Sequence, residues 1–162
     1  MRLLTFALIV AAGTTQAQEK VAFFGLTMID DSLQTTELGQ DPDEVARLET
    51  LERMVAARFA EEGYDLVDLE PARADIDRVA NIAKCYGCDT RIAADLGADY
   101  SLVGEVQKTS NLILALNLQL RSVETGEMVK GGVADIRGNT DETWERGMRY
   151  ILKNRFFGAK TN

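Results

Sequence analysis

The stretch L-I-L-A-L-N-L-Q-L, residues 112–120, places a leucine at every second position. Between the leucines stand Ile113, Ala115, Asn117 and Gln119. Successive side chains of a strand point to opposite faces of a sheet. Strict alternation of this length therefore predicts a strand with one fully apolar face, running from Leu112 to Leu120.

Two flanking runs supply neighbours for this strand. Residues 100–107, Y-S-L-V-G-E-V-Q, precede it across the turn K-T-S-N. Residues 128–137, M-V-K-G-G-V-A-D-I-R, follow it across the hairpin turn E-T-G-E. The three runs predict an antiparallel meander. Gly131 and Gly132 lie inside the last strand, where they predict a bulge or close packing rather than a phosphate-binding loop.

The amino-terminal half predicts strands alternating with helices. V-A-F-F-G-L (21–26) and Y-D-L-V-D-L (64–69) are β-type runs, separated by a polar loop and a helix. Residues 41–44, D-P-D-E, start this helix, with the first aspartate as its cap and Glu44 closing a capping box. The apolar face of the helix comprises Val45, Leu48, Leu51, Val55 and Phe59.

Three more helices are predicted. An alanine-rich helix runs from Pro71 to about Ala83, and a short helix over residues 90–96 is capped by Asp89. A final helix is capped by Asn139, with Glu142 at its third position. The buried face of this last helix comprises Trp144, Met148, Ile151 and Leu152.

The predicted element order is β-α-β-α-α-β-β-β-α. A β-α-β start that leads into an antiparallel meander predicts an α/β (α+β) domain, in which helices pack on one mixed sheet. The sequence predicts a single domain over residues 18–157 and a frayed tail over residues 158–162.

The first 17 residues have the pattern of a secretory signal peptide. Arg2 precedes an apolar run over residues 3–12, and Thr15 and Ala17 place small side chains at the −3 and −1 positions of a cleavage site after Ala17. The run is too short to span a bilayer, which needs roughly 20 apolar residues. The sequence therefore predicts an exported protein without membrane insertion.

Charge and composition exclude several functions. The formal net charge is −8, which argues against nucleic acid or an anionic membrane as a partner, because both need clustered Lys and Arg. The chain contains no histidine, which excludes Ser-His and Cys-His nucleophile pairs and histidine metal ligands. We therefore expect no enzyme activity, no metal and no cofactor.

The two cysteines stand in the motif K-C-Y-G-C-D, as Cys85 and Cys88. A haem handle needs histidine where Asp89 stands, and a zinc site needs two ligands more than the chain offers. An exported protein meets oxidising conditions, so a structural disulfide is the default interpretation. A redox centre at a helix amino terminus and an intermolecular metal or partner bond remain as alternatives.

Two polar sets are candidate binding surfaces. The first follows the central strands and consists of Gln107, Lys108, Asn111, Asn117, Gln119 and Arg121. The second lies in D-I-R-G-N-T-D-E-T-W and consists of Asp135, Arg137, Asn139 and Asp141. The first set is either a solvated sheet face or a recognition surface. The second either caps the last helix or holds an anion at its amino terminus.

An acidic loop provides a weaker candidate for cation binding. Its carboxylates do not match the spacing of an EF-hand loop. They are Asp30, Asp31, Glu37, Asp41 and Asp43.

The stretch I-A-A-D-L-G-A-D-Y-S-L-V-G-E-V-Q, followed by L-R-S-V-E-T-G-E, resembles the TolB amino-terminal and CsgG-like α/β domains. The chain lacks the lipid-anchor cysteine and the pore-forming insertions of CsgG, so the resemblance does not imply pore formation. The matching residues are Leu96, Gly97, Ala98, Tyr100, Leu102, Gly104, Val106, Thr125 and Gly126.

The motifs K-C-Y-G-C-D, V-Q-K-T-S-N-L-I-L and D-I-R-G-N-T-D-E-T-W resemble a family of small exported bacterial proteins of unknown function. That resemblance implies a periplasmic location and an α/β fold, and it implies no established activity. It also implies an accessory role beside a periplasmic quinoprotein or envelope system.

Our leading hypothesis is a non-enzymatic periplasmic accessory module that binds a protein partner. The alternatives are a thiol–disulfide redox protein that uses Cys85 and Cys88, and a periplasmic protein that binds a small ligand or cation. The sequence does not indicate an oligomeric state.

Overall fold

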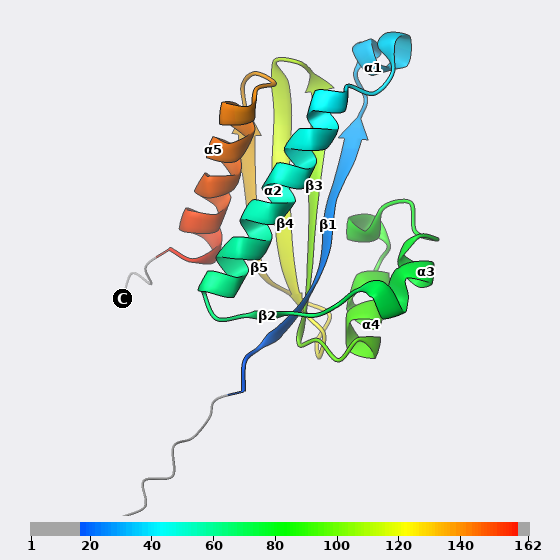
Figure 1. The fold of residues 1–162 in the computed structure, drawn as a ribbon, viewed down its shortest axis with the longest axis vertical. Helices are drawn as coiled ribbons and strands as arrows, with labels where there is room; N and C mark the ends of the chain where they lie inside the picture. The colour runs from blue at the N-terminus through cyan, green and yellow to red at the C-terminus, as the bar shows by residue number, and fades with distance from the viewer. Residues whose placement is uncertain (1–16, 159–162) are drawn as a thin grey trace, which may run out of the picture.

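A computed structural model describes residues 17–158, which form a mixed five-stranded sheet with helices on both faces (Figure 1). The strands have the spatial order β2-β1-β3-β4-β5. They are β1 (Lys20–Asp30), β2 (Asp65–Leu66), β3 (Tyr100–Ser110), β4 (Ile113–Ser122) and β5 (Met128–Ile136). β1 is parallel to β2 and β3, whereas β3, β4 and β5 form an antiparallel meander. The predicted fold class is confirmed.

Five α-helices connect and cover these strands in the described residues. They are α1 (Leu33–Leu38), α2 (Pro42–Glu61), α3 (Arg73–Ile76), α4 (Cys88–Asp95) and α5 (Asp141–Ile151). Short helical turns occur at η1 (Glu70–Ala72), η2 (Ile82–Lys84) and η3 (Leu152–Phe156). The predicted signal peptide and the predicted frayed tail lie outside the described residues, apart from Ala17 and Gly158. Across residues 17–158, no helix combines the length and the apolar character needed to cross a membrane.

The front face of the sheet, which α2 and α5 cover, carries the main core (Figure 1). Leu114, Leu116, Leu118 and Leu120 of β4 are each at most 1% exposed. Burying a leucine side chain contributes roughly 1.5–3 kcal/mol, so this row is a large part of the core. Against it pack Leu51, Val55 and Phe59 of α2 and Trp144, Met148 and Ile151 of α5.

Two glycines allow α5 to approach the sheet closely. A Cβ atom at Gly132 of β5 would lie 2.8 Å from the Cγ2 atom of Ile151. A Cβ atom at Gly147 of α5 would lie 2.7 Å from the Cγ2 atom of Ile136. Real Cβ atoms do not come so near, so glycine at both positions sets the spacing between helix and sheet. The close packing predicted for Gly131-Gly132 is confirmed at Gly132.

The back face of the sheet is covered only in part. Ile82 and Ile92 pack against Val103 of β3, and Ala93 packs against Ala22 of β1. These contacts come from η2 and α4, which lie over β1 and β3. No helix of the described residues covers the back of β4 and β5.

The apolar faces of two elements differ at one end from the prediction. Leu112 lies in the turn before β4 and is 72% exposed, because β3 continues to Ser110 and the turn is displaced toward β4. Val45 near the start of α2 is exposed, because Glu44 is the residue that faces inward in this turn of the helix.

The segment between β1 and β3 differs more strongly. The polar loop predicted after residue 26 instead continues β1 to Asp30 and then forms α1. The strand predicted over residues 64–69 is only two residues long. The helix predicted from Pro71 to Ala83 is broken, because the Asn81 side chain accepts a hydrogen bond from the Ala83 amide and starts a new turn.

The predicted helix caps are only partly correct. Asp41 caps α2 as predicted, but Glu44 binds Lys108 in the interior instead of closing a capping box. Thr140, rather than Asn139, caps α5, and it forms a capping box with Thr143. Gly87 precedes α4 in a left-handed conformation, so Asp89 is not the cap and its side chain is buried.

Candidate functional site

The structure separates the predicted binding residues, most of which lie either on the back or at the front of the sheet. Gln107, Asn117, Gln119, Arg121 and Asp135 lie on the back of the sheet. Lys108, Asn139 and Asp141 lie at the front, where α2 meets α5. Asn111 lies in the turn between β3 and β4, and Arg137 follows the end of β5 and is exposed.

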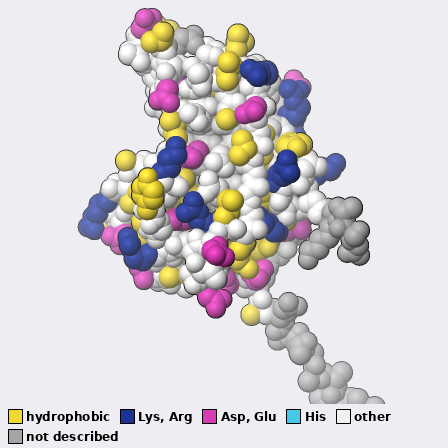
Figure 2. Space-filling model, turned by 180° about the vertical axis from the view of Figure 1, so that it is seen from behind, with side chains coloured by type: hydrophobic (Ala, Val, Ile, Leu, Met, Phe, Trp, Pro, Cys, Tyr) yellow, Lys and Arg dark blue, Asp and Glu magenta, His cyan; other side chains and the backbone are white. Residues whose placement is uncertain are grey.

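We use the term open face for the back of β4 and β5, which no described helix covers. Figure 2 looks onto the back of the molecule, where hydrophobic, polar and charged side chains alternate at the surface. Val133 is 55% exposed and lies opposite Asn117, while Asp135 lies opposite Ala115. The open face consists of Ile113, Ala115, Asn117, Gln119, Arg121, Val133 and Asp135.

A hollow of about 330 Å³ lies where the open face meets the helical cover. Asn117, Gln119 and Arg121 form its floor on β4, and the segment that precedes α4 forms its wall. Tyr86 stands at the rim of this hollow and is fully exposed. The lining residues are Ala83, Lys84, Tyr86, Glu105, Asn117, Gln119 and Arg121.

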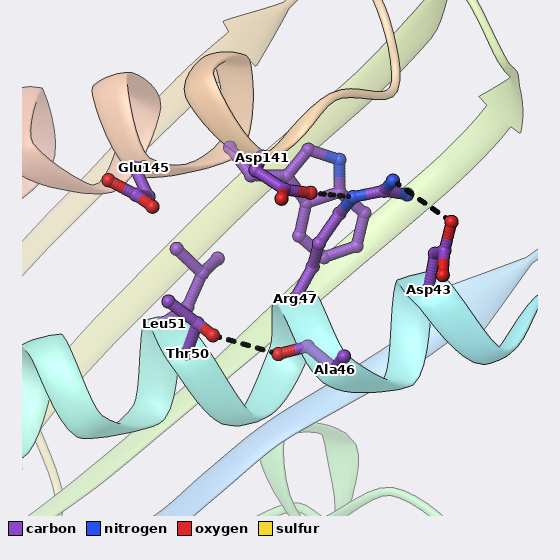
Figure 3. Close-up of a pocket in the computed structure, with 8 residues that line it drawn as sticks. Asp43, Ala46, Arg47, Thr50, Leu51, Asp141 and Glu145 are labelled. Atoms are coloured by element: carbon purple, nitrogen blue, oxygen red, sulfur yellow. Dashed lines mark hydrogen bonds and ion pairs between the residues drawn. The ribbon is translucent and has the colours of Figure 1, made fainter.

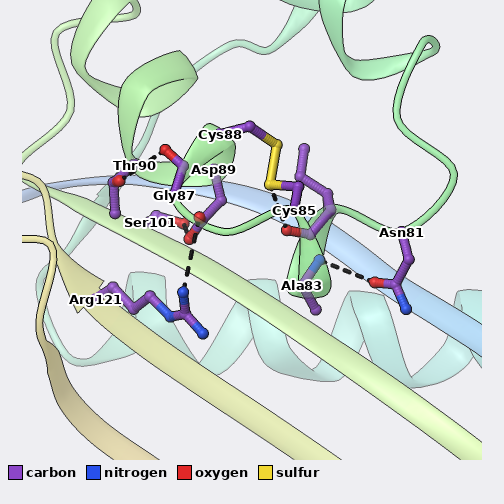
Figure 4. Close-up of a disulfide and its surroundings, with 10 residues drawn as sticks. Asn81, Ala83, Cys85, Gly87, Cys88, Asp89, Thr90, Ser101 and Arg121 are labelled. Carbon is purple, nitrogen blue, oxygen red and sulfur yellow. Dashed lines mark hydrogen bonds and ion pairs between the residues drawn. A yellow bond between two sulfur atoms is a disulfide. The ribbon is translucent and has the colours of Figure 1, made fainter.

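The Arg121 guanidinium is held in place beside the hollow (Figure 4). Its Nη2 atom donates a hydrogen bond to Gln119 Oε1 at 2.7 Å, and its Nη1 atom lies 3.9 Å from Asp89 Oδ1. Asp89 is 1% exposed, and its Oδ2 atom accepts a hydrogen bond from Ser101 Oγ at 2.8 Å. The carboxylate in the first turn of α4 also suits the helix dipole. Arg121 is therefore a pre-positioned cation.

Glu105 is the other charged group that faces the hollow from the sheet. Its Oε1 atom accepts a hydrogen bond from Asn81 Nδ2 at 2.8 Å and pairs with Lys84 Nζ at 3.3 Å. The hollow therefore presents paired charges and side-chain amides together with one exposed aromatic ring.

Cys85 and Cys88 form a disulfide that joins η2 to the first residue of α4 (Figure 4). Tyr86 and Gly87 between them both have positive φ angles, of 55° and 95°. The disulfide thus closes a tight corner, and Tyr86 in this corner is exposed. Cys88 is buried.

At the front, Lys108 is not a surface residue, contrary to the prediction. It is 2% exposed, and its Nζ atom lies 2.7 Å from Glu44 Oε1 and 3.1 Å from Asp30 Oδ2. The reason is the period of the strand: Gln107 points to the back, so Lys108 must point to the front.

The pKa values of this cluster follow from its contacts. Burial alone would raise the pKa of Asp30, but hydrogen bonds donated by Ser32, Thr35 and Lys108 outweigh it and lower the pKa to about 2. Burial alone would lower the pKa of Lys108, but its bonds to Glu44 and Asp30 outweigh burial and raise it. Asp30 and Lys108 are therefore both charged at neutral pH. Because Asp30 is engaged in this cluster, the acidic loop does not form the predicted cation site.

Asn139 extends the cluster to α5. Its Nδ2 atom donates to Glu44 Oε1 at 2.5 Å, and its Oδ1 atom accepts from Trp144 Nε1 at 2.9 Å and from Arg47 Nη1 at 3.3 Å. Arg47 Nε in turn lies 2.7 Å from Asp141 Oδ1. Asn139 and Asp141 therefore hold α5 to α2 instead of forming a free polar surface.

A groove of about 210 Å³ runs between α2 and α5 above these contacts (Figure 3). Arg47 crosses it, with Asp43 on one side and Asp141 on the other. Arg47 is therefore paired on both sides and links α2 to α5. Among the described residues, no group of acidic, Cys or His side chains is arranged to hold a metal ion.

Sequence reasoning missed Lys84, Tyr86 and Glu105, which complete the hollow. Glu105 shares the strand parity of Gln107, so the period of β3 places it on the back face. Tyr86 lies between two cysteines that approach each other in the folded chain, and a side chain in so short a loop has little room to turn inward. Lys84 carries no signal of this kind in the sequence.

Comparison with known families and structures adds the following findings. The family model DUF3280, described as "Protein of unknown function (DUF2380)", matches residues 19–156. No curated protein matches the sequence.

Among solved structures, the LpoB C-terminal domain from Salmonella enterica has a similar fold, with a TM-score of 0.52 and 21% identity, over 78% of this chain and 87% of that chain. Lipoprotein GNA1162 from Neisseria meningitidis has a TM-score of 0.50 and 16% identity, over 75% of this chain and 82% of that chain. TolB from Acinetobacter baumannii has a TM-score of only 0.43 and 14% identity, over 84% of this chain and 28% of that chain. At these identities the similarity shows the fold alone, and the TolB resemblance is weak.

Proposed function

Because this chain belongs to the DUF3280 family, whose function is unknown, we propose its role from its own structure. It is an exported, non-enzymatic accessory module that binds a protein partner in the periplasm through the open face and the adjoining hollow.

The observation that carries this proposal is the unequal cover of the two sheet faces. The front is sealed by α2 and α5, whereas the back of β4 and β5 leaves Ile113 and Val133 exposed beside Asn117 and Asp135. Antiparallel sheets often leave one face to solvent, but that face is then mainly polar. Exposed aliphatic side chains among amides and charges match the mixed composition of protein interfaces.

The hollow adds the kind of residues that dominate binding energy. Tyrosine and arginine are enriched among the interface residues whose truncation weakens binding most. Tyr86 projects at the rim, and Arg121 is pre-positioned by Gln119 and Asp89. The Arg121 side chain does not have to be ordered at the moment of binding, which lowers the entropic cost of association.

The absence of histidine from the chain supports a non-enzymatic role. The disulfide and the predicted signal peptide support an oxidising, exported location. We place the partner in the cell envelope, with a periplasmic quinoprotein system as one candidate.

The experiment is affinity capture from periplasmic extract with three baits: the wild type, Val133→Arg and Val45→Arg. Both substitutions place an arginine at an exposed valine, one on the open face and one on α2. We expect the wild type and Val45→Arg to retain the same partner, and Val133→Arg to retain it at least about tenfold more weakly, a change of about 1.4 kcal/mol.

Thermal unfolding of the three proteins checks that each is folded. Equal retention by Val133→Arg, or no partner on the wild type, would refute the proposal.

A further inference from the structure

β5 is an edge strand, and no strand of residues 17–158 pairs with its outer side. It is the last strand in the order β2-β1-β3-β4-β5 and is nine residues long. An edge of this length presents a row of backbone N–H and C=O groups that can pair with another extended chain. The opposite edge, β2, has only two residues and offers no comparable row.

Three cations lie along this edge without an ion pair to any described residue. Lys130 lies on β5 with its Nζ atom 5.1 Å from the centroid of the Phe157 ring, and Arg137 follows the end of the strand. Arg155 of η3 lies over the middle, where a Cβ atom at Gly132 would come within 2.9 Å of the Arg155 Cβ atom. At about 3.4 Å per residue, Lys130 and Arg137 are about 24 Å apart, so the cations extend along the whole strand.

The described acidic groups nearby form no ion pair with this row, and Glu127, directly before β5, is exposed. Asp135 is the only acidic residue of β5, and it points to the open face. On α5, which packs on β5, Glu142 pairs with Arg146 at 3.6 Å and Glu145 pairs with Arg149 at 2.8 Å. In a chain of net charge −8, a cationic edge is a local exception.

We propose that β5 binds an extended acidic segment of a partner protein, which adds to the sheet as a sixth strand. Backbone hydrogen bonds to β5 supply the pairing, and Lys130, Arg155 and Arg137 select for Asp and Glu side chains. Because Val133 and Asp135 of β5 also belong to the open face, the added strand would enlarge that surface. The inference rests on the proposed function in one respect, that the partner is a protein.

A second copy of this chain fits the edge less well. Antiparallel pairing of β5 with another β5 would bring Lys130 and Arg137 of the two copies toward one another. Like charges on facing strands are destabilising. The charge of the edge therefore favours a different, acidic chain.

The test uses two labelled nine-residue peptides, one alternating Thr with Glu and one alternating Thr with Lys. Fluorescence anisotropy measures the affinity of each for the whole protein at low salt. Amide hydrogen exchange measures the protection of β5. We expect the Glu peptide to bind at least about tenfold more tightly than the Lys peptide and to slow exchange in β5.

Two variants locate the site. Lys130→Glu combined with Arg155→Glu should weaken binding of the Glu peptide at least tenfold. Arg91→Glu is the matched control, because Arg91 is an exposed cation of α4, also without an ion pair to a described residue. It should change the affinity less than twofold.

Several results would overturn the inference: equal affinity for the two peptides, an equal loss with Arg91→Glu, or unchanged exchange in β5. Concentration-dependent dimerisation that the Lys130→Glu, Arg155→Glu variant abolishes would assign the edge to a second copy instead. If this double variant still captures the periplasmic partner that Val133→Arg loses, the edge inference fails while the proposed function stands.

Discussion

The two faces of the sheet differ in how completely helices cover them. On the front, one row of leucines from β4 meets two long helices and excludes water completely. On the back, short turns and α4 cover β1 and β3, and the remaining strands are left open. The front therefore provides most of the stability, and the back is free to carry residues chosen for binding.

The Lys108 cluster provides the strongest test of this difference between the two faces, because it places charges in the otherwise apolar front. Lys108→Met leaves the carboxylates of Asp30 and Glu44 buried without their cation. Removing one partner of a buried ion pair costs about 3–5 kcal/mol. Urea unfolding followed by the fluorescence of Trp144, the single tryptophan, measures the loss.

The matched control for this change is Lys84→Met on the back face. Lys84 pairs with Glu105, but its side chain is largely exposed, so we expect a loss of about 1 kcal/mol or less. Similar losses for the two variants would mean that the front cluster is not the buried network described here.

Leu118 and Asn117 give a sharper comparison, because they are neighbours on β4 that point to opposite faces. Leu118→Ala leaves a cavity among α2, α5 and the sheet and should cost about 2–5 kcal/mol. Asn117→Ala removes a side chain of the open face and should change the free energy of unfolding by about 0.5 kcal/mol or less. Denaturant titration of both variants measures the difference, and a large effect of Asn117→Ala would show that the open face is structural.

The loss expected at the disulfide lies at the lower end of the range given for Leu118→Ala. Replacing Cys85 and Cys88 by serine opens a loop of only four residues, which contributes about 2 kcal/mol in the chain-entropy model. We expect faster amide exchange in α4 and unchanged exchange in α2 and α5, measured under native conditions. Insulin reduction by the wild type that exceeds reduction by this variant would instead support the thiol–disulfide hypothesis.

Much of the fold could be predicted because its signals are local. The alternation over residues 112–120 predicted β4 and its buried face, and the spacing of Trp144 and Met148 predicted the buried side of α5. The prediction of one helix from Pro71 to Ala83 was wrong, because contacts with distant residues decide the structure of this segment. Its alanine-rich composition favours a helix, but contacts with the back of β3 and the cap at Asn81 break the segment into turns.

The candidate site was predicted only in part. The period of β4 correctly grouped Asn117, Gln119 and Arg121, because residues two apart share one face. The same rule, applied to β3, would have separated Gln107 from Lys108. The role of Asn139 could not be read from its neighbours, because its partner Glu44 lies 95 residues away.

The pattern of residues along the chain was thus enough to indicate the strands of the meander, the apolar side of each main helix and a disulfide as the default state of Cys85 and Cys88. Folding in three dimensions set which face of β4 receives the helices, which cations are buried and which edge stays unpaired. The physical reason is range: alternation and capping act between residues a few positions apart, whereas Lys108 meets Asp30 across 78 positions. Such a contact depends on how the strands are ordered in the sheet, which no short stretch of sequence specifies.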